Sequence, residues 1–254
     1  MKYMTIKGGK SRVRANGKPF AVPVVVTKSK KFGKVIKEES ISTKQPVLIT
    51  GGHDSGKTYW IGRLFRKSDL IWSKYPDGAV FLDPLRPLMA WQESPAVVGW
   101  YGKQVKSMYT EPTEWARTRY TEHGELPPWS KLKAFERQEM ISEYLADAKA
   151  LLFVDNCHRL TGRKQQIVKD CLIASNLYIL AVSDEERLPA SIRHMVLKRK
   201  PQTFRLGTDT AYDATTLMVY FAMLIAFSAG AWEISLVLGG LTALSKSKRS
   251  SRQD

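Results

Sequence analysis

The chain has 254 residues and carries 40 lysine and arginine side chains against 24 aspartate and glutamate side chains, a formal net charge of +16. Two cysteines, Cys157 and Cys171, are too few for a disulfide-rich secreted scaffold, and both are expected to stay reduced. The length suits one α/β domain with additions, and the basic excess favours a polyanionic partner, either nucleic acid or an anionic membrane surface.

Residues 1–45 are expected to form a small β-rich N-terminal extension. The apolar run 20–26 is typical of a strand, and the pair Gly8-Gly9 marks a turn. Pro23 lacks a backbone N–H, so this strand is predicted at the edge of its sheet. The extension is expected to pack on the domain that follows or to contact another subunit.

A glycine-rich segment lies between a predicted strand at 46–50 and a predicted helix at 59–66. It has the complete G-x-x-x-x-G-K-T spacing of a Walker A loop, in the strand–helix context that the motif requires. Backbone N–H groups of such a loop surround phosphate oxygens, and the dipole of the helix favours the same anion. The alternative is a strand–helix turn that matches by chance. The residues predicted to bind ATP are Gly51, Gly52, His53, Asp54, Ser55, Gly56, Lys57 and Thr58.

Two further apolar runs, 79–83 and 150–155, are predicted to be parallel strands of the same sheet, and each ends in an aspartate. The second run has the Walker B pattern and follows a predicted amphipathic helix at 132–149. Asp155 is therefore expected to hold Mg²⁺ together with the Thr58 hydroxyl, while Lys57 reaches the β- and γ-phosphates. Asp83 is expected at the same edge of the sheet, either as a catalytic carboxylate or as a solvated loop charge.

Residues 84–130 are predicted to be an insertion within a nucleotide-binding domain that spans 46–210. The segment is rich in aromatic residues and has weak periodicity. The favoured interpretation is an insertion with its own small core. The alternative is a surface on which aromatic and basic side chains bind single-stranded nucleic acid. The tryptophans concerned are Trp91, Trp100, Trp115 and Trp129.

A helix at 164–174 and a strand at 177–183 follow, and 203–206 is a plausible last strand. Asp184 and Glu185, after the strand, are further candidates for a catalytic carboxylate or are solvated charges. Arg193 or Arg199 would reach the γ-phosphate of a neighbouring subunit if the protein forms a ring. A surface or lipid-headgroup role is the alternative for both arginines.

Residues 211–245 are predicted to be a membrane segment, followed by a basic polar tail at 246–254. The stretch 214–232 has no charged side chain, and Glu233 separates it from a second apolar stretch. One long helix and a re-entrant hairpin both remain open, because basic residues flank both ends. The alternative is a buried helical hairpin in a soluble lid.

This ordered set of motifs resembles the P-loop ATPases of the additional-strand class. In many of those a glutamate follows the Walker B aspartate and polarises the attacking water. Here that position is Asn156, which cannot accept a proton and puts fast hydrolysis in doubt. The class also places a γ-phosphate-sensing polar residue at the end of the next strand. The resemblance gives this role to Ser183, although an ordinary serine at a strand end is the alternative.

With the apolar segment added, the layout resembles membrane-anchored phage ATPases. These are the zonula occludens toxin-like assembly proteins of filamentous phages and the packaging ATPases of membrane-containing phages, in the FtsK/HerA group. The resemblance implies a homo-oligomeric motor that uses ATP and Mg²⁺ to move DNA. It also implies contacts with phage structural proteins, and a place in the host inner membrane or the virion membrane with the nucleotide domain on the cytoplasmic side.

Two other functions remain open from the sequence. The first is an ATP-dependent switch or adaptor that assembles on nucleic acid or membrane with little hydrolysis, which Asn156 favours. The second is a small-molecule kinase, which the absence of a lid with closely spaced arginines disfavours. DNA or RNA as the nucleic acid is not decided by the sequence.

Overall fold

The computed structural model describes residues 2–13, 19–28, 35–75, 78–123, 125–207 and six residues between 221 and 230. The chain divides into two units, residues 1–208 and 209–254. The predicted membrane segment and basic tail lie outside the described residues, apart from those six. Within the described part of the chain, no helix combines the length and the apolar character needed to cross a membrane.

The first unit is built on a five-stranded parallel sheet with the order β5-β6-β7-β4-β8. All five strands were predicted to within one residue at each end, and four of them are short apolar runs between polar turns, whereas β8 has only Phe204 buried. The strand β7 lies between β4, which leads into the glycine-rich loop, and β6, which ends before Asp155. The strands are β4 (Val47–Thr50), β5 (Ala79–Leu82), β6 (Leu151–Val154), β7 (Leu177–Val182) and β8 (Gln202–Arg205).

Both faces of this sheet are buried, which explains why its strands are apolar at every position rather than at alternate ones. Side chains along a strand still alternate between two cores. On β4, Leu48 packs into one core while Val47 and Ile49 pack into the other.

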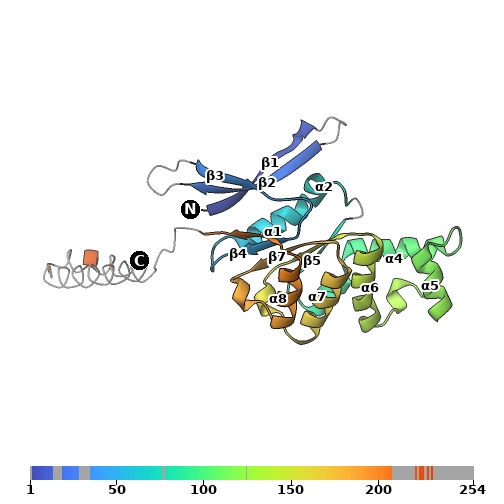
Figure 1. Ribbon diagram of the computed structural model, residues 1–254. Helices are drawn as coiled ribbons and strands as arrows, with labels where there is room; N and C mark the ends of the chain where they lie inside the picture. The colour runs from blue at the N-terminus through green and yellow to red at the C-terminus, as the bar shows by residue number, and fades with distance from the viewer. Residues whose placement is uncertain are drawn as a thin grey trace. The chain divides into compact units, whose positions relative to one another are not determined.

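Helices cover each face (Figure 1). On one face lie α1 (Lys57–Arg66) and the short α2 (Ser68–Ile71), whose apolar side chains share a core with the N-terminal sheet. The other face carries α4 (Pro95–Ser107), α6 (Ala134–Asp147), α7 (Gly162–Ala174) and α8 (Ala190–Lys198). This arrangement confirms the predicted α/β class and the predicted parallel central sheet.

The segment 84–130 is mostly helical, with α3 (Leu88–Gln92), α4, α5 (Glu114–His123) and the short helix η1 (Trp129–Lys131). Its tryptophans are packed inside the molecule. Trp91 and Trp100 are only 2% and 8% exposed, and both belong to the main core. Trp115 donates its indole N–H to Glu143 at 2.8 Å. The predicted separate small core of this insertion is therefore wrong, because Trp91 and Trp100 belong to the main core, and Trp115 and Trp129 are partly buried against it.

The N-terminal extension is β-rich, as predicted, and forms a three-stranded antiparallel sheet with the order β1-β2-β3. The predicted turn at Gly8-Gly9 is wrong, because both glycines lie within β1 and pair with β2. The prediction that Pro23 marks an edge strand is wrong, because its strand β2 is the central one. The register explains this. β3 ends at Ser40, which pairs with Val24, and the Pro23 carbonyl accepts a hydrogen bond from Ile41 N at 2.9 Å beyond that end. The position where Pro23 lacks an N–H therefore lies beyond the last residue pair of β2 and β3, so no hydrogen bond between these two strands is lost. The strands are β1 (Lys2–Val13), β2 (Pro19–Lys28) and β3 (Val35–Ser40).

Hydrogen bonds join the extension to the last strand of the central sheet. The backbones of Lys2 and Gly207 exchange two of them, at 2.9 and 3.1 Å. The Gln202 side chain accepts from Ser42 N at 2.7 Å and donates to Ser40 O at 3.1 Å.

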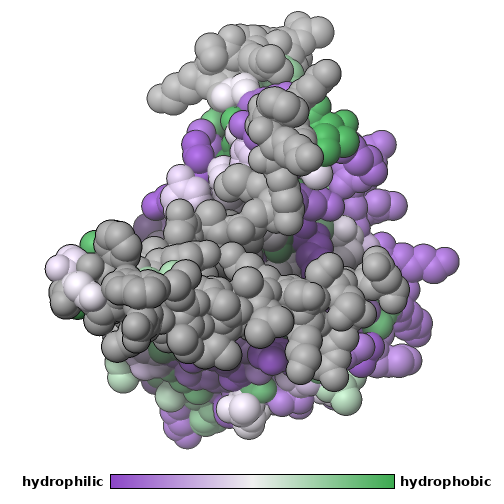
Figure 2. Space-filling model, turned by 90° about the vertical axis from the view of Figure 1, so that its left-hand side faces the viewer, coloured by the Kyte–Doolittle hydropathy of each residue, from purple (hydrophilic) through white to green (hydrophobic). Residues whose placement is uncertain are grey.

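On the face drawn in Figure 2, the described surface is largely hydrophilic, with hydrophobic groups in separate patches.

Candidate nucleotide-binding site

The glycine-rich loop joins β4 to α1 with a backbone that needs glycine at two positions. Gly56, directly before α1, has a left-handed φ of 76°. A Cβ atom on Gly51 would lie 2.6 Å from both Leu206 O and Ser55 Oγ, so a side chain there would displace the loop from β8. The helix begins at Lys57, two residues earlier than predicted, which places Lys57 and Thr58 in its first turn.

The Lys57 ammonium group turns back over the loop. It donates to the carbonyl oxygens of Gly51 and Gly52, both at 2.6 Å, and to Ser55 Oγ at 3.1 Å. Burial lowers the pKa of Lys57, and the negative charges of Asp155 and Asp54 oppose that shift. The cation is thus held at the centre of the loop, where a phosphate group would replace neutral carbonyls as its partner.

Asp155 sits at the end of β6 and is 1% exposed. Its Oδ1 accepts a hydrogen bond from Asn156 N at 2.8 Å, whereas its buried Oδ2 has no partner in the described part of the structure. Burial raises the pKa of this carboxyl, and the Thr58 hydroxyl and Asn156 N–H partly offset the shift. A desolvated carboxylate beside a threonine hydroxyl is a donor set that fits Mg²⁺.

Mg²⁺ is usually held by one or two carboxylates together with the phosphates of its nucleotide, rather than by a protein cage. In the residues that the structure describes, no group of three or more His, Cys, Asp or Glu side chains is arranged to hold a metal. A site of the nucleotide-sharing kind is therefore the one that Thr58 and Asp155 can make.

Asp83 follows β5 and lies next to the Walker B turn. Its Oδ1 accepts from the Asn156 amide at 3.3 Å and from Leu85 N at 3.1 Å. Its carbonyl accepts from the Trp91 indole at 3.0 Å. Asn156 itself has a left-handed φ of 47°, which turns the chain after β6. The residue in the usual glutamate position thus contacts a carboxylate delivered by the neighbouring strand.

Ser183 lies at the end of β7, next to the glycine-rich loop. Its carbonyl accepts from Gly51 N at 3.2 Å, which ties the loop to β7. Its hydroxyl oxygen is buried and has no partner among the described residues. Of the other candidates after β7, Asp184 accepts a hydrogen bond from Glu186 N at 3.5 Å, so its side chain caps a short turn.

His158 is a residue of this site that the sequence did not indicate. It lies on the short helix η2 (Cys157–Arg159), three residues beyond Asp155, and η2 packs against β7. Its Nδ1 is buried without a partner in the described structure. The proximity of a histidine to the Walker B aspartate was visible in the sequence, but its burial against β7 depends on the turn at Asn156.

The two arginines proposed as fingers differ. Arg199 donates to Ser175 O at 2.7 Å and to Ile173 O at 3.5 Å, and it lies over the Tyr178 ring. Arg199 is therefore used within its own subunit to bind carbonyls at the end of α7. Arg193 on α8 is half-buried, and its guanidinium has no hydrogen-bond or ion-pair partner in the described part of the chain.

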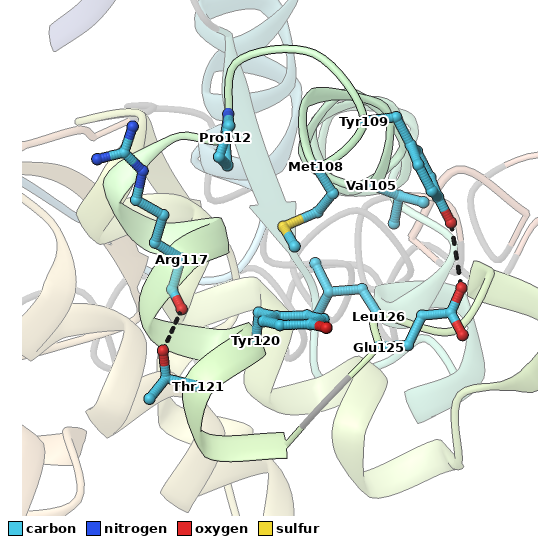
Figure 3. A pocket seen from close by; sticks show the side chains of 9 residues that line it. All are labelled: Val105, Met108, Tyr109, Pro112, Arg117, Tyr120, Thr121, Glu125 and Leu126. Carbon is cyan, nitrogen blue, oxygen red and sulfur yellow. Dashed lines mark hydrogen bonds between the residues drawn. The ribbon is translucent and has the colours of Figure 1, made fainter.

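Two cavities are relevant to ligand binding. One, of about 620 Å³, adjoins the site and is lined by Thr58, Asp83 and Asp155 together with the outer face of α1. The other, of about 650 Å³, lies between the end of α4 and α5 and shares no lining residue with the first (Figure 3). We call the second the α4–α5 cavity. Within the loop, the exposed side chains of His53 and Asp54 contact each other, with 3.0 Å between Nδ1 and Oδ1.

No protein-family model matches the sequence, and no curated protein matches it. Among solved structures, the chain is similar to ATPases 2 and 3 of EccC from Thermomonospora curvata in complex with a signal sequence peptide. The identity is 15% and the TM-score 0.39, over 73% of this chain and 35% of that chain.

It is also similar to a putative ATP-binding protein of an ABC transporter from Pyrococcus furiosus, with 12% identity and a TM-score of 0.35, over 81% of this chain and 98% of that chain. The chain spans about a third of the EccC chain that it matches. The case for nucleotide binding rests on the glycine-rich loop and the residues around it, and not on these similarities.

Proposed function

We propose that this chain binds ATP with Mg²⁺ and hydrolyses it. One observation carries the proposal. A complete Walker A loop with a half-buried lysine lies beside Asp155, whose Oδ2 is buried and has no partner within the described structure. A buried carboxylate oxygen without a partner costs free energy, which a ligand at that position recovers.

Each residue has a distinct role in this proposal. The loop N–H groups and the first turn of α1 bind the phosphates. Lys57 exchanges its carbonyl partners for phosphate oxygens, and Thr58 and Asp155 hold Mg²⁺. When bound, the metal ion neutralises charge that develops on the phosphates.

Asp83 is the residue that we assign to accept the proton of the attacking water. It is the carboxylate nearest the Walker B turn in place of the usual glutamate, and Asn156 and Leu85 N fix its orientation. A base must be held within hydrogen-bond reach of its water, and this position is fixed from two sides. Asn156 then acts as a positioning residue.

The strand order supports membership of the additional-strand class, since β7 separates the P-loop strand from the Walker B strand. We further propose that the protein is a homo-oligomeric, membrane-anchored motor that moves DNA in phage assembly or packaging. The charge of +16 and the apolar segment 211–245 support this role. The host inner membrane or virion membrane would carry it, with phage structural proteins as partners.

The α4–α5 cavity also suits a nucleic-acid partner. Tyr109 and Tyr120 are 75% and 51% exposed, and Arg117 on α5 lines the same cavity (Figure 3). Exposed rings with a cation can stack on bases and neutralise a phosphate. The aromatic surface proposed for this segment would thus consist of tyrosines, since the tryptophans are in the core.

The second candidate is an ATP-dependent switch with little turnover. The observation that favours it is the Asp83–Asn156 contact. Asp83 Oδ1 already accepts hydrogen bonds from the Asn156 amide and from Leu85 N, which leaves this oxygen less able to accept one from a water molecule.

The test is ATP hydrolysis by the purified full chain, with and without DNA or RNA, beside Lys57→Ala. We expect turnover that rises with DNA and falls at least about 100-fold in the variant, because Lys57 contacts the transferred phosphoryl group. Nucleotide binding by the wild type with no turnover would support the switch. Phosphate transfer to a small acceptor would point to a kinase, and no binding at all would overturn both candidates.

A further inference from the structure

Unpartnered buried polar atoms gather at the end of β6 and β7. Five side-chain nitrogen or oxygen atoms in the described structure are buried without a partner, and three of them belong to Asp155, His158 and Ser183. Such atoms are uncommon in folded proteins, because each forfeits its hydrogen bonds to water. Asp155 has its role in holding Mg²⁺, which leaves His158 to be explained.

The fold brings His158 close to the glycine-rich loop, where its ring interacts electrostatically with Lys57 and Asp155. The left-handed turn at Asn156 directs η2 back against β7, whose end carries Ser183. Ser183 O in turn accepts from Gly51 N at the start of the loop. One connected set of backbone contacts therefore runs from the loop through β7 to the helix that carries His158.

The imidazole is suited to donate a hydrogen bond to an anion. Burial lowers the pKa of His158, and the neighbouring cations Arg159, Lys57 and Arg187 lower it further, whereas Asp155 opposes them. A neutral imidazole carries one N–H, which can sit on Nδ1. Lys57 and Arg187 near the ring also make its surroundings favourable for a phosphate oxygen.

We propose that His158 is a specificity-determining residue that donates a hydrogen bond from Nδ1 to the γ-phosphate of ATP, so that the site distinguishes ATP from ADP. This inference rests on the proposed function, because it assumes that ATP occupies the loop. The Ser183 hydroxyl is a second donor from the adjacent strand end. Neither donor has a partner in the described structure, and both would gain one only with the triphosphate.

The experiment compares two affinities of the purified full chain, for ADP and for a non-hydrolysable ATP analogue, both with Mg²⁺, by titration calorimetry. The variants are His158→Ala, His158→Asn and His158→Gln. An asparagine amide nitrogen can approach the Nδ1 position, whereas a glutamine amide lies nearer the Nε2 position. The matched control is His194→Ala, which removes an exposed histidine on α8.

We expect His158→Ala and His158→Gln to weaken binding of the ATP analogue about ten-fold or more, with ADP affinity within about two-fold of wild type. His158→Asn should retain most of the preference, and His194→Ala should change neither affinity. If His158→Ala does not fold, the comparison of His158→Asn with His158→Gln decides, because only the asparagine variant should keep the preference for the ATP analogue.

Equal losses for ADP and the ATP analogue, or no loss for either, would overturn the assignment and leave nucleotide binding intact. A wild-type chain that binds neither nucleotide would overturn the proposed function and this inference together. A wild type that binds both nucleotides equally would overturn the inference alone.

Discussion

Asp155 is a carboxylate that the folded chain removes almost completely from water. Burial raises its pKa, so at neutral pH the ionised form costs stability relative to the unfolded chain. Under the proposed function, this cost is offset when the carboxylate binds Mg²⁺. Stability and function therefore oppose each other at this one side chain.

Replacement of Asp155 with asparagine should separate its effect on stability from its effect on ATP hydrolysis. We expect the Tm of Asp155→Asn to exceed that of wild type at pH 7, because the buried charge is gone. The difference should shrink as pH falls through the raised pKa, where wild type becomes neutral too. ATP turnover should fall at least about 100-fold, since the metal loses its carboxylate. A lower Tm at neutral pH would show that Asp155 stabilises the fold.

The substitution Asp83→Asn tests whether Asp83 accepts the proton of the attacking water. The variant keeps the shape of the side chain but cannot accept a proton, so turnover should fall about 100-fold or more while ATP affinity stays within about two-fold. Single-turnover kinetics with binding by calorimetry measure both. Asp184→Asn is the matched control, because that side chain caps a turn after β7. Equal effects of the two changes would remove Asp83 from the mechanism.

The residues of the loop and Asp155 could be predicted because their motifs are local in the sequence. The contact between Asp83 and Asn156 could not, since 73 residues separate them and the contact depends on β5 and β6 being neighbours. His158 was missed for a similar reason, as its burial follows from the packing of η2 on β7.

At the scale of elements, the two arginines after β7 differ in whether the fold itself uses their side chains. Arg199 binds carbonyl oxygens at the end of α7 and lies over Tyr178, whereas Arg193 on α8 is not engaged by any described group. This contrast decides which of them is available to a neighbouring subunit.

Arg199→Ala should lower stability by about 1 kcal/mol, because it removes hydrogen bonds and a cation–π contact, and it should leave turnover unchanged. Arg193→Ala should leave the Tm unchanged and lower turnover at least about 100-fold if it serves as a finger in trans. Urea denaturation and steady-state ATPase assays measure the two effects. A stable Arg193→Ala protein with normal turnover would exclude that arginine as a finger.

The elements differ in how far the sequence determined them. Four of the parallel strands, β4 to β7, were predictable because two-sided burial makes each an apolar run. The helices α4 and α5 were not, because their packing depends on distant partners such as Glu143, which binds the Trp115 indole. The prediction that Pro23 marks an edge strand was wrong for a related reason, since its place in a central strand depends on where β3 ends.

For the whole molecule, the division after Thr208 makes a prediction about truncation. A chain of residues 1–208 keeps both cores, the glycine-rich loop and every site residue described above. We expect it to fold cooperatively and to bind ATP within about two-fold of the full chain, as calorimetry and thermal denaturation can measure. Loss of nucleotide binding would place part of the site beyond residue 208.

The backbone exchange between Lys2 and Gly207 has a mechanical consequence. A pull on the chain beyond Gly207 is resisted first by these two hydrogen bonds and then by β8. Leu206 N donates to Thr50 O at 2.7 Å. Leu206 O lies so close to Gly51 that a Cβ atom there would be only 2.6 Å away from it. Tension on the C-terminal part of the chain would therefore be transmitted within one residue to the base of the glycine-rich loop. The nucleotide site would then be sensitive to load.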